Sequence, residues 1–133
     1  MKKVSIIIPC YNEESNLINL YQNLASFMNE HSEYLWQILL INDGSRDHTL
    51  EIIKNIRTKD KRFCYIHLSR NFGKENAMLA GFDHVHGDCC IIMDADLQHP
   101  IQVIPKMLKL WEQGYDDVYA TVSYTHLRAH ETV

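Results

Sequence analysis

The stretch of sequence that decides the fold is VSIIIP, residues 4–9. This run is continuous, rich in β-branched residues and ended by Pro9, which is typical of a strand buried on both faces of a parallel sheet. Apolar side chains then recur at helical spacing over residues 17–28, and Asn12 is the expected N-cap of that helix. The chain therefore opens with a strand that leads into an amphipathic helix.

The same alternation of short apolar runs and amphipathic segments continues along the chain. Further strands are predicted at residues 36–41, 63–68, 89–93 and 117–120. Helices are predicted around residues 50–56, over residues 75–85, and from Pro100 to the C′ residue Gly114. Ser45 or Asp47 is the expected cap of the second helix. Strands that alternate with helices predict an α/β fold, a Rossmann-like and mostly parallel sheet with helices on both faces.

The final segment, VSYTHLRAHETV at residues 122–133, breaks this pattern. It has neither a strand period nor a helix period, and it is similar to a translated cloning sequence. We therefore expect one domain at residues 1–121 and a non-native or disordered tail at residues 122–133.

The composition limits the classes of protein to which the chain can belong. Its 133 residues are 46% apolar and 23% charged, as in one soluble globular domain. Thirteen basic and seventeen acidic residues give a net charge of −4, so no nucleic-acid partner is expected. The four cysteines form no CxxC pair, which favours buried, reduced thiols in a cytoplasmic protein. No signal peptide is visible and no run approaches the ~20 apolar residues of a membrane span, so the chain is expected to be soluble or peripheral.

Polar clusters follow four of the predicted strands, at residues 9–14, 42–45, 69–74 and 94–99. In a parallel sheet the carboxyl ends of the strands share one edge, and ligands bind in the crevice beyond it. Any one of these clusters alone is explained equally well as turn chemistry. Four of them at one sheet edge favour a binding or catalytic site.

The sharpest of these clusters is the pattern Asp94-x-Asp96-x-Gln98. Two carboxylates and one amide oxygen form a hard, incomplete set of ligands, which suits Mg²⁺ or Mn²⁺ bound together with phosphates and water. Such a metal would screen the charge of a diphosphate leaving group. The alternative is a helix N-terminus decorated with acids, because Asp just before Pro100 also favours the helix dipole.

Two acids and two cations complete the predicted crevice. Glu13 and Asp43 are candidates to accept hydrogen bonds from a base or a ribose, as acids do in dinucleotide sites. Arg70 and Lys74 would bring positive charge beside a diphosphate. The alternatives are a turn and helix cap at Asp43 and solvated surface charge at the two cations.

The four clusters together resemble the signature of glycosyltransferase family 2, which has the GT-A fold. The matching strings are VSIIIPCYNEE at 4–14, NDGSRD at 42–47, LSRNFGKE at 68–75 and MDADLQHP at 93–100. The last two strings are similar to the branch of the family that acts on polyprenyl phosphates. The resemblance spans residues 3 to about 121.

This resemblance implies an enzyme, an inverting glycosyltransferase that moves a hexose from a UDP- or GDP-linked donor to a polyprenyl phosphate. The residues implied in nucleotide-sugar binding are Pro9, Tyr11, Glu13, Asp43, Arg70 and Lys74. Asp94 and Asp96 are implied as catalytic residues, and Asp94, Asp96 and Gln98 as ligands of Mg²⁺ or Mn²⁺. An acceptor that is already a phosphate anion needs little help from a general base, so positioning and leaving-group stabilisation would dominate the reaction.

Members of this family continue well past the matched region, so we expect this chain to be the truncated, donor-binding part. The complete protein is then expected at the cytoplasmic face of the membrane. A sheet that ends at residues 117–120 leaves an unpaired edge, which favours a homo-oligomer.

Three other functions are alternatives to this one. A nucleotide-sugar-binding fragment without turnover would bind the donor but transfer nothing. A phosphate-accepting receiver domain needs an acid pair and one phospho-acceptor Asp, and Glu13-Glu14 with the spaced Asp94 and Asp96 fits that pattern poorly. A dinucleotide oxidoreductase is disfavoured because the five glycines form no GxGxxG motif.

Overall fold

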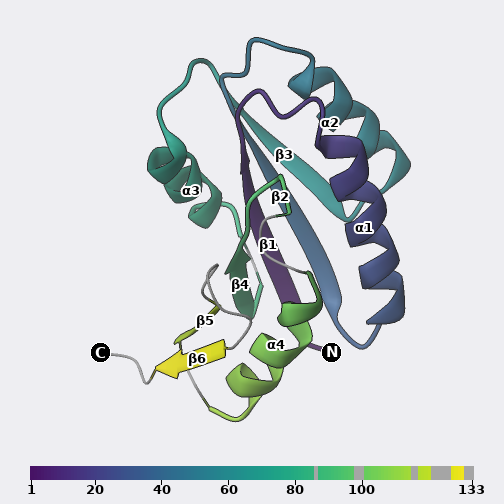
Figure 1. Cartoon of the computed structure of the whole chain (residues 1–133), viewed down its shortest axis with the longest axis vertical. Helices are drawn as coiled ribbons and strands as arrows, with labels where there is room; N and C mark the ends of the chain where they lie inside the picture. Colours follow the sequence, from purple (N-terminus) through teal and green to yellow (C-terminus); the bar gives the residue numbers. More distant parts are fainter. Residues whose placement is uncertain (86, 98–100, 115–116, 121–126, 131–133) are drawn as a thin grey trace. The chain divides into compact units, whose positions relative to one another are not determined.

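The structure of the chain is a computed structural model that describes residues 1–85, 87–97, 101–114, 117–120 and 127–130. The chain divides into two compact units, Met1–Asp96 and Leu97–Val133. Figure 1 shows the order of the elements along the chain.

The first unit is built on a four-stranded sheet. Its strands are β1 (Lys3–Cys10), β2 (Leu35–Asp43), β3 (Phe63–Leu68) and β4 (Cys89–Ile92). They lie in the order β3-β2-β1-β4, and every neighbouring pair is parallel, as the sequence predicts. β2 is longer than expected, because Asn42 and Asp43 continue its ladder opposite His67 and Leu68. The first two residues of the second polar cluster are therefore held in a strand.

Three helices cover the two faces of this sheet: α1 (Leu17–Glu30), α2 (Thr49–Lys59) and α3 (Lys74–Phe82). Tyr21 of α1 contacts Phe63 edge to face, with ring centroids 5.2 Å apart. Ala77 of α3 packs instead in a cluster with Ile7, Leu39 and Ile41, which point to the opposite face. In Figure 1, α1 and α2 accordingly lie on one side of the strands and α3 lies on the other.

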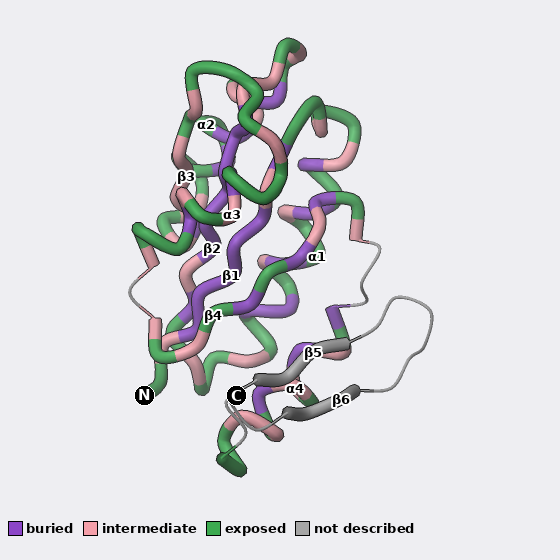
Figure 2. The backbone as a smooth tube through the Cα atoms, turned by 90° about the vertical axis from the view of Figure 1, so that its left-hand side faces the viewer, coloured by how far each residue is buried: buried purple, intermediate pink, exposed green. Residues whose placement is uncertain are grey.

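The core of the first unit lies along β1 and β2. Their central residues are almost entirely buried, as the continuous apolar runs predict, and Figure 2 shows this buried track along both strands. The hydroxyl of Ser5, buried inside β1, donates a 2.8 Å hydrogen bond to Oε1 of Gln37 on β2, which satisfies it in the core. α3 approaches β1 so closely that a Cβ on Gly81 would lie 2.8 Å from Cγ2 of Ile7.

Two of the predicted helix caps differ from the structure. α1 begins at Leu17, so its N-cap is Asn16, and Asn12 lies four residues earlier in the loop; the prediction for Asn12 is wrong. For α2 the N-cap is His48, but Asp47 supplies the expected carboxylate: its Oδ1 accepts the N–H of Thr49 at 2.9 Å.

The second unit contains η1 (Ile101–Val103), α4 (Ile104–Glu112), β5 (Asp117–Ala120) and β6 (Leu127–His130). Gly114 follows α4 with φ 108°, as expected for a C′ glycine, whereas Pro100 lies outside the described residues. The strand predicted at residues 117–120 is present, but it pairs antiparallel with β6 in a separate two-stranded sheet. β6 falls inside the tail for which the sequence predicted no strand. Within the described residues, no helix is both long enough and apolar enough to cross a membrane.

Candidate functional site

The strand order of the first unit defines where a ligand is expected to bind. β2 and β3 lie on one side of β1, and β4 lies on the other, so the order reverses between β1 and β4. In open parallel sheets, ligands bind beyond the carboxyl ends of the strands at such a reversal. The residues that follow β1 and β4 therefore border the candidate site.

The loop after β1 is tied to the loop after β2 by reciprocal hydrogen bonds. Asn12 has φ 52°; its N–H donates to Oγ of Ser45 at 3.0 Å, and its Oδ1 accepts the N–H of Arg46 at 2.9 Å. The N–H of Glu13 donates to Oγ1 of Thr49 at 2.9 Å. These bonds explain why Asn12 does not cap α1, since its amide is used to join two strand ends.

Glu13 lies half-buried in this loop, where the resemblance places a nucleoside contact. Its Oε2 accepts a 2.7 Å hydrogen bond from Nδ2 of Asn16, the N-cap residue of α1. Tyr11 is exposed directly after β1, and Pro9 is half-buried inside β1 opposite Ile41. These three predicted binding residues thus follow one another along the carboxyl end of β1.

Asp47 and Thr49 organise these loops, although the sequence predicted Asp47 only as a helix cap and did not single out Thr49. Thr49 is fully buried, and its hydroxyl donates to Oδ1 of Asp47 at 2.5 Å while it accepts the N–H of Glu13. Burial raises the pKa of Asp47, but hydrogen bonds from Thr49 and from the N–H of Glu14 outweigh burial and hold the pKa below its ordinary value. A signal was present in the sequence: Asp followed two residues later by Thr at a predicted helix start.

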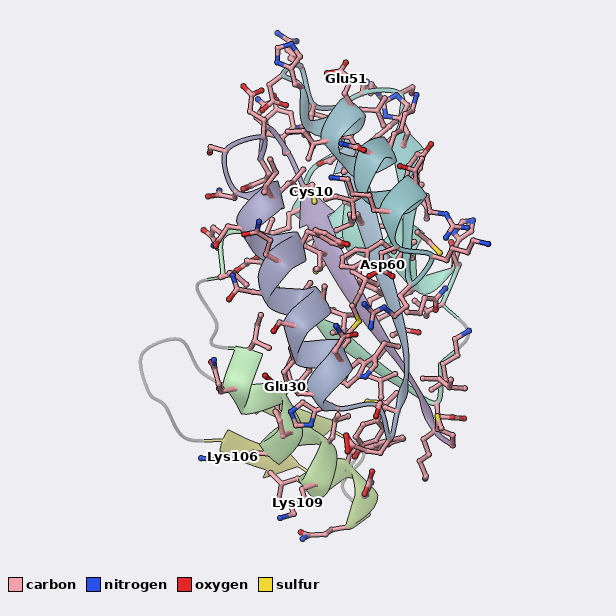
Figure 3. The ribbon with its side chains drawn as sticks, turned by 90° about the vertical axis from the view of Figure 1, so that its right-hand side faces the viewer. Cys10, Glu30, Glu51, Asp60, Lys106 and Lys109 are labelled. Carbon is pink, nitrogen blue, oxygen red and sulfur yellow. The ribbon has the colours of Figure 1, made fainter. Side chains whose placement is uncertain are left out.

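The exposed rim of the same loops holds an ion pair. Nδ1 of His48 lies 3.0 Å from Oε2 of Glu14, and the N–H of His48 also donates to this oxygen. The hydrogen bond to Glu14, together with the charges of Glu14 and Glu51, raises the pKa of His48 above its ordinary value. Figure 3 shows Glu51 on the outer surface of α2.

Beneath these loops lies Cys10, the last residue of β1, labelled in Figure 3. It is buried, and burial followed by the nearby charge of Glu13 raises the pKa of its thiol far above the ordinary range. A thiol held protonated in this way is a poor nucleophile, so Cys10 is a packing residue. All four cysteines are free, as expected, but burial is confirmed for Cys10 alone: Cys64 and Cys89 are half-buried and Cys90 is exposed.

Asp43 ends β2 and is buried, with only 3% of the residue exposed. Its Oδ1 accepts the N–H of Phe72 at 2.7 Å and its Oδ2 accepts the N–H of Gly73 at 3.0 Å. The carboxylate therefore holds the loop that follows β3 and leads into α3. The nucleoside contact assigned to Asp43 by resemblance remains a prediction.

The two predicted cations both belong to this loop and its helix. The Arg70 guanidinium lies over the Phe72 ring, 4.6 Å from the centroid, which fixes its direction through a cation–π contact. Lys74 is the first residue of α3, and its Nζ donates to Oδ1 of Asp94 at 2.5 Å. The structure thus brings Lys74 together with the first acid of the predicted metal cluster.

Asp94 and Asp96 follow β4 on either side of a buried Ala95. Asp94 is partly buried and Asp96 is exposed, whereas the third predicted ligand, Gln98, lies outside the described residues. Among the residues that the structure describes, no three His, Cys, Asp or Glu side chains are grouped as a metal site. The two carboxylates are hard oxygen donors and suit the divalent cation that the sequence predicts, with the remaining ligands to come from elsewhere.

Comparison with known proteins supports the resemblance to glycosyltransferase family 2. The model of the family described as "Glycosyl transferase family 2" matches residues 5–128. CsbB of Bacillus subtilis (strain 168) is 50% identical over 118 residues, which are 88% of this chain and 35% of CsbB. The bactoprenol glucosyl transferase of Shigella phage SfX is 42% identical over 118 residues, 89% of this chain and 38% of that protein. The chain thus spans little more than a third of the length of these relatives.

Solved structures show the same fold at low sequence identity. The mannosyltransferase PcManGT of Pyrobaculum calidifontis, in complex with GDP-Man and Mn²⁺, superposes with a TM-score of 0.75 over 88% of this chain and 34% of its own, at 18% identity. Residues 1–349 of S. aureus TarS give a TM-score of 0.69 at 23% identity, over 87% of this chain and 34% of the other. The fold is thus that of the GT-A glycosyltransferases, and the family match covers most of the described residues. This chain belongs to glycosyl transferase family 2.

Proposed function

We propose that this chain is the donor-binding part of an inverting glycosyltransferase that moves a hexose from a UDP- or GDP-sugar to a polyprenyl phosphate. The observation that carries the proposal is the pairing of Lys74 with Asp94 at the sheet edge where the strand order reverses. A cation and an acid at this place suit a diphosphate and its counter-ion. The identity to bactoprenol glucosyl transferases supports a lipid-linked acceptor.

In this proposal the nucleoside lies along the carboxyl end of β1, against Pro9, Tyr11 and Glu13. Tyr11 is exposed and directly follows the strand, so its ring is free to contact a base. The backbone N–H of Glu13 donates to Thr49, and its carboxylate accepts from Asn16, which fixes the carboxylate before a ligand arrives. A preorganised acceptor of this kind loses little conformational entropy on binding.

The diphosphate lies in the proposal between the cations of the loop after β3 and the acids after β4. Arg70 and Lys74 face its negative charge, and Asp94 and Asp96 hold a divalent cation, Mg²⁺ or Mn²⁺. When bound, that cation would stabilise the charge that develops on the leaving nucleoside diphosphate. Mn²⁺ in the structure of PcManGT supports this choice of metal.

A phosphate acceptor is already an anion, so no base is required to activate it. The work of the chain is then to orient the donor and to stabilise the leaving group. Because a polyprenyl phosphate is a lipid, the complete protein is proposed to act at the cytoplasmic face of a membrane. We propose no nucleic-acid partner for this protein.

The proposal is tested by a thermal-shift panel on the chain with UDP-glucose, UDP, GDP-mannose and GDP, each with Mn²⁺ and with EDTA. We expect one nucleotide class to raise the melting temperature, and Mn²⁺ to increase the shift. A transfer assay with the bound donor and a short polyprenyl phosphate then separates a complete enzyme from a fragment that binds without turnover. No shift with any nucleotide in either condition would contradict the proposal.

A further inference from the structure

The loop after β3 and the first residue of α3, together residues 70–74, carry both proposed diphosphate-binding cations, and we call this segment the basic loop. The middle of this segment is hydrogen-bonded to the last residue of β2, Asp43. The two oxygens of Asp43 accept the consecutive N–H groups of Phe72 and Gly73, at 2.7 and 3.0 Å. A buried carboxylate that receives two backbone N–H groups forms charge-assisted bonds that are stronger than neutral ones.

A second contact holds the beginning of the same loop. Gly44 has φ 66°, and a Cβ built on it would lie 2.2 Å from the backbone carbon of Arg70 and 2.4 Å from the nitrogen of Asn71. The two backbones therefore touch, and only glycine allows both this approach and this φ. Asp43 and Gly44 thus hold the basic loop at two successive points.

The held backbone determines where the two cations lie. Arg70 stacks on Phe72, whose N–H is bound by Asp43. Lys74 directly follows Gly73, the second anchored residue, and reaches Asp94 from the first position of α3. Movement of the anchored pair would therefore move both cations relative to the acid after β4.

We infer that Asp43 and Gly44 form a clamp that positions the basic loop, and that Asp43 is a positioning residue for the diphosphate group of the donor. Asp43 acts through Arg70 and Lys74, because with 3% exposure it has almost no surface for a ligand. The identity of the ligand, a diphosphate, rests on the proposed function, whereas the contacts of the clamp do not depend on it. It differs from a nucleoside contact, because it places the effect of Asp43 on the phosphates.

The discriminating variant is Asp43→Asn, which keeps the shape but turns an NH₂ group toward one of the two backbone N–H groups. Its matched control is Asp88→Asn, because Asp88 also accepts a backbone N–H, that of Lys3 at 2.9 Å, at the amino end of β1. Affinities for inorganic pyrophosphate, UDP and GDP are measured by calorimetry on the full chain with Mn²⁺. We expect Asp43→Asn to weaken pyrophosphate and the preferred nucleotide by the same factor, at least about fivefold, and Asp88→Asn to change neither.

The result that would overturn the inference is a loss of nucleotide affinity with unchanged pyrophosphate affinity, since that pattern indicates a direct nucleoside contact. Gly44→Ala provides a second test and is expected to lower pyrophosphate affinity as well. Its control is Gly114→Ala, because Gly114 also has a positive φ, 108°, but nothing within 4 Å of an added Cβ. Equal effects of the two glycine substitutions would count against the clamp.

Amide hydrogen exchange keeps the clamp testable apart from the ligand. In the wild-type chain the N–H groups of Phe72 and Gly73 are expected to be protected, and Asp43→Asn is expected to lower that protection while leaving that of β1 unchanged. The loss is expected to be larger at Phe72, because the N–H of Gly73 also donates to Oδ1 of Asn71 at 3.0 Å. A chain that binds no nucleotide or pyrophosphate would refute the proposed function and the diphosphate role, but protected amides would still show the clamp. Equal exchange in the wild type and the variant would show that there is no clamp.

Discussion

The ammonium of Lys74 lies 2.5 Å from Oδ1 of Asp94, and this ion pair joins the start of α3 to the end of β4. The two side chains are 59% and 26% exposed, so solvent screens the pair and its contribution to folding stability is small. The pair matters for the proposed site, because it places a cation beside the acids that are proposed to hold the metal.

Lys74→Gln is predicted to weaken pyrophosphate binding about threefold to tenfold, about 0.7–1.4 kcal/mol, because a cation that faces the phosphates is lost. Lys74→Arg should retain most of the affinity, since it keeps the charge. Lys54→Gln, a change at an exposed lysine of α2, is the control for net charge. Calorimetry gives the three affinities, and equal losses for Lys54→Gln and Lys74→Gln would remove Lys74 from the site.

Donor binding is predicted to depend on a divalent cation through Asp96. Asp96→Ala should weaken UDP or GDP binding in Mn²⁺ at least tenfold, or about 1.4 kcal/mol, because one of the carboxylate ligands is lost. Asp83→Ala, at the exposed C-cap of α3, should leave the affinity unchanged. The idea fails if the wild-type chain binds the nucleotide equally well in EDTA and in Mn²⁺.

The interlocked loops after β1 and β2 are predicted to be most stable between pH ~4 and ~6.5. The pKa of Asp47 is lowered, so its contribution is present above its ordinary value and is lost as the pH falls through the lowered pKa. The pKa of His48 is raised, so the pairing with Glu14 is present below the ordinary value for histidine and is lost as the pH rises through the raised pKa.

The histidine side of this window is tested by titration of the His48 ring in NMR spectra. Glu14→Gln should lower the pKa of His48 more than Glu51→Gln does, because Glu14 provides both the hydrogen bond and a charge, whereas Glu51 provides a charge alone. The reverse order of the two effects would show that the hydrogen bond to Glu14 is not formed in solution.

Gly81→Ala is predicted to lower the free energy of unfolding by about 1–3 kcal/mol, as overpacked core substitutions do. In an exposed helix interior the same change would be stabilising by up to ~1 kcal/mol. Here the added Cβ would lie 2.8 Å from Cγ2 of Ile7 on β1, so the helix must move away from the sheet. Urea denaturation measures the difference, and a gain in stability would show that α3 packs less closely than described.

Removal of residues 122–133 is predicted to leave nucleotide binding and the main thermal transition essentially unchanged. All of the proposed binding residues except Gln98 lie in the first unit, Met1–Asp96. β5 would lose its partner β6 and become an unpaired edge, so stronger self-association in ultracentrifugation is the expected side effect. Loss of folding on this deletion would show that the segment is an authentic part of the domain.

Much of the fold is determined by local sequence pattern. The run VSIIIP predicted a parallel strand buried on both faces, and β1 is parallel to both of its neighbours, with residues 4–8 fully buried. The polar clusters likewise predicted where the strands end, to within two residues, because strand ends and turn residues are set by short-range preferences. Pro9 and Cys10 still belong to β1, and Asn42 and Asp43 still belong to β2. Family membership was also readable from these clusters and is confirmed.

Contacts between distant segments were decided only by the tertiary structure. Asparagine is a residue type that commonly caps helices, but the hydrogen-bond partners of Asn12 are Ser45 and Arg46, in the loop after β2. β5 has the β propensity of a strand, yet a single sequence does not specify which strand pairs with it.

Asp43 shows this division most clearly. Its place at the end of a buried strand was predicted from sequence, but the N–H groups that occupy its carboxylate come from Phe72 and Gly73, across 29 and 30 residues of chain. Side-chain type determines which bonds a residue can form. The partner is determined by the packing of β2 against β3, which brings the two strand ends together and leaves a buried charge that must be satisfied.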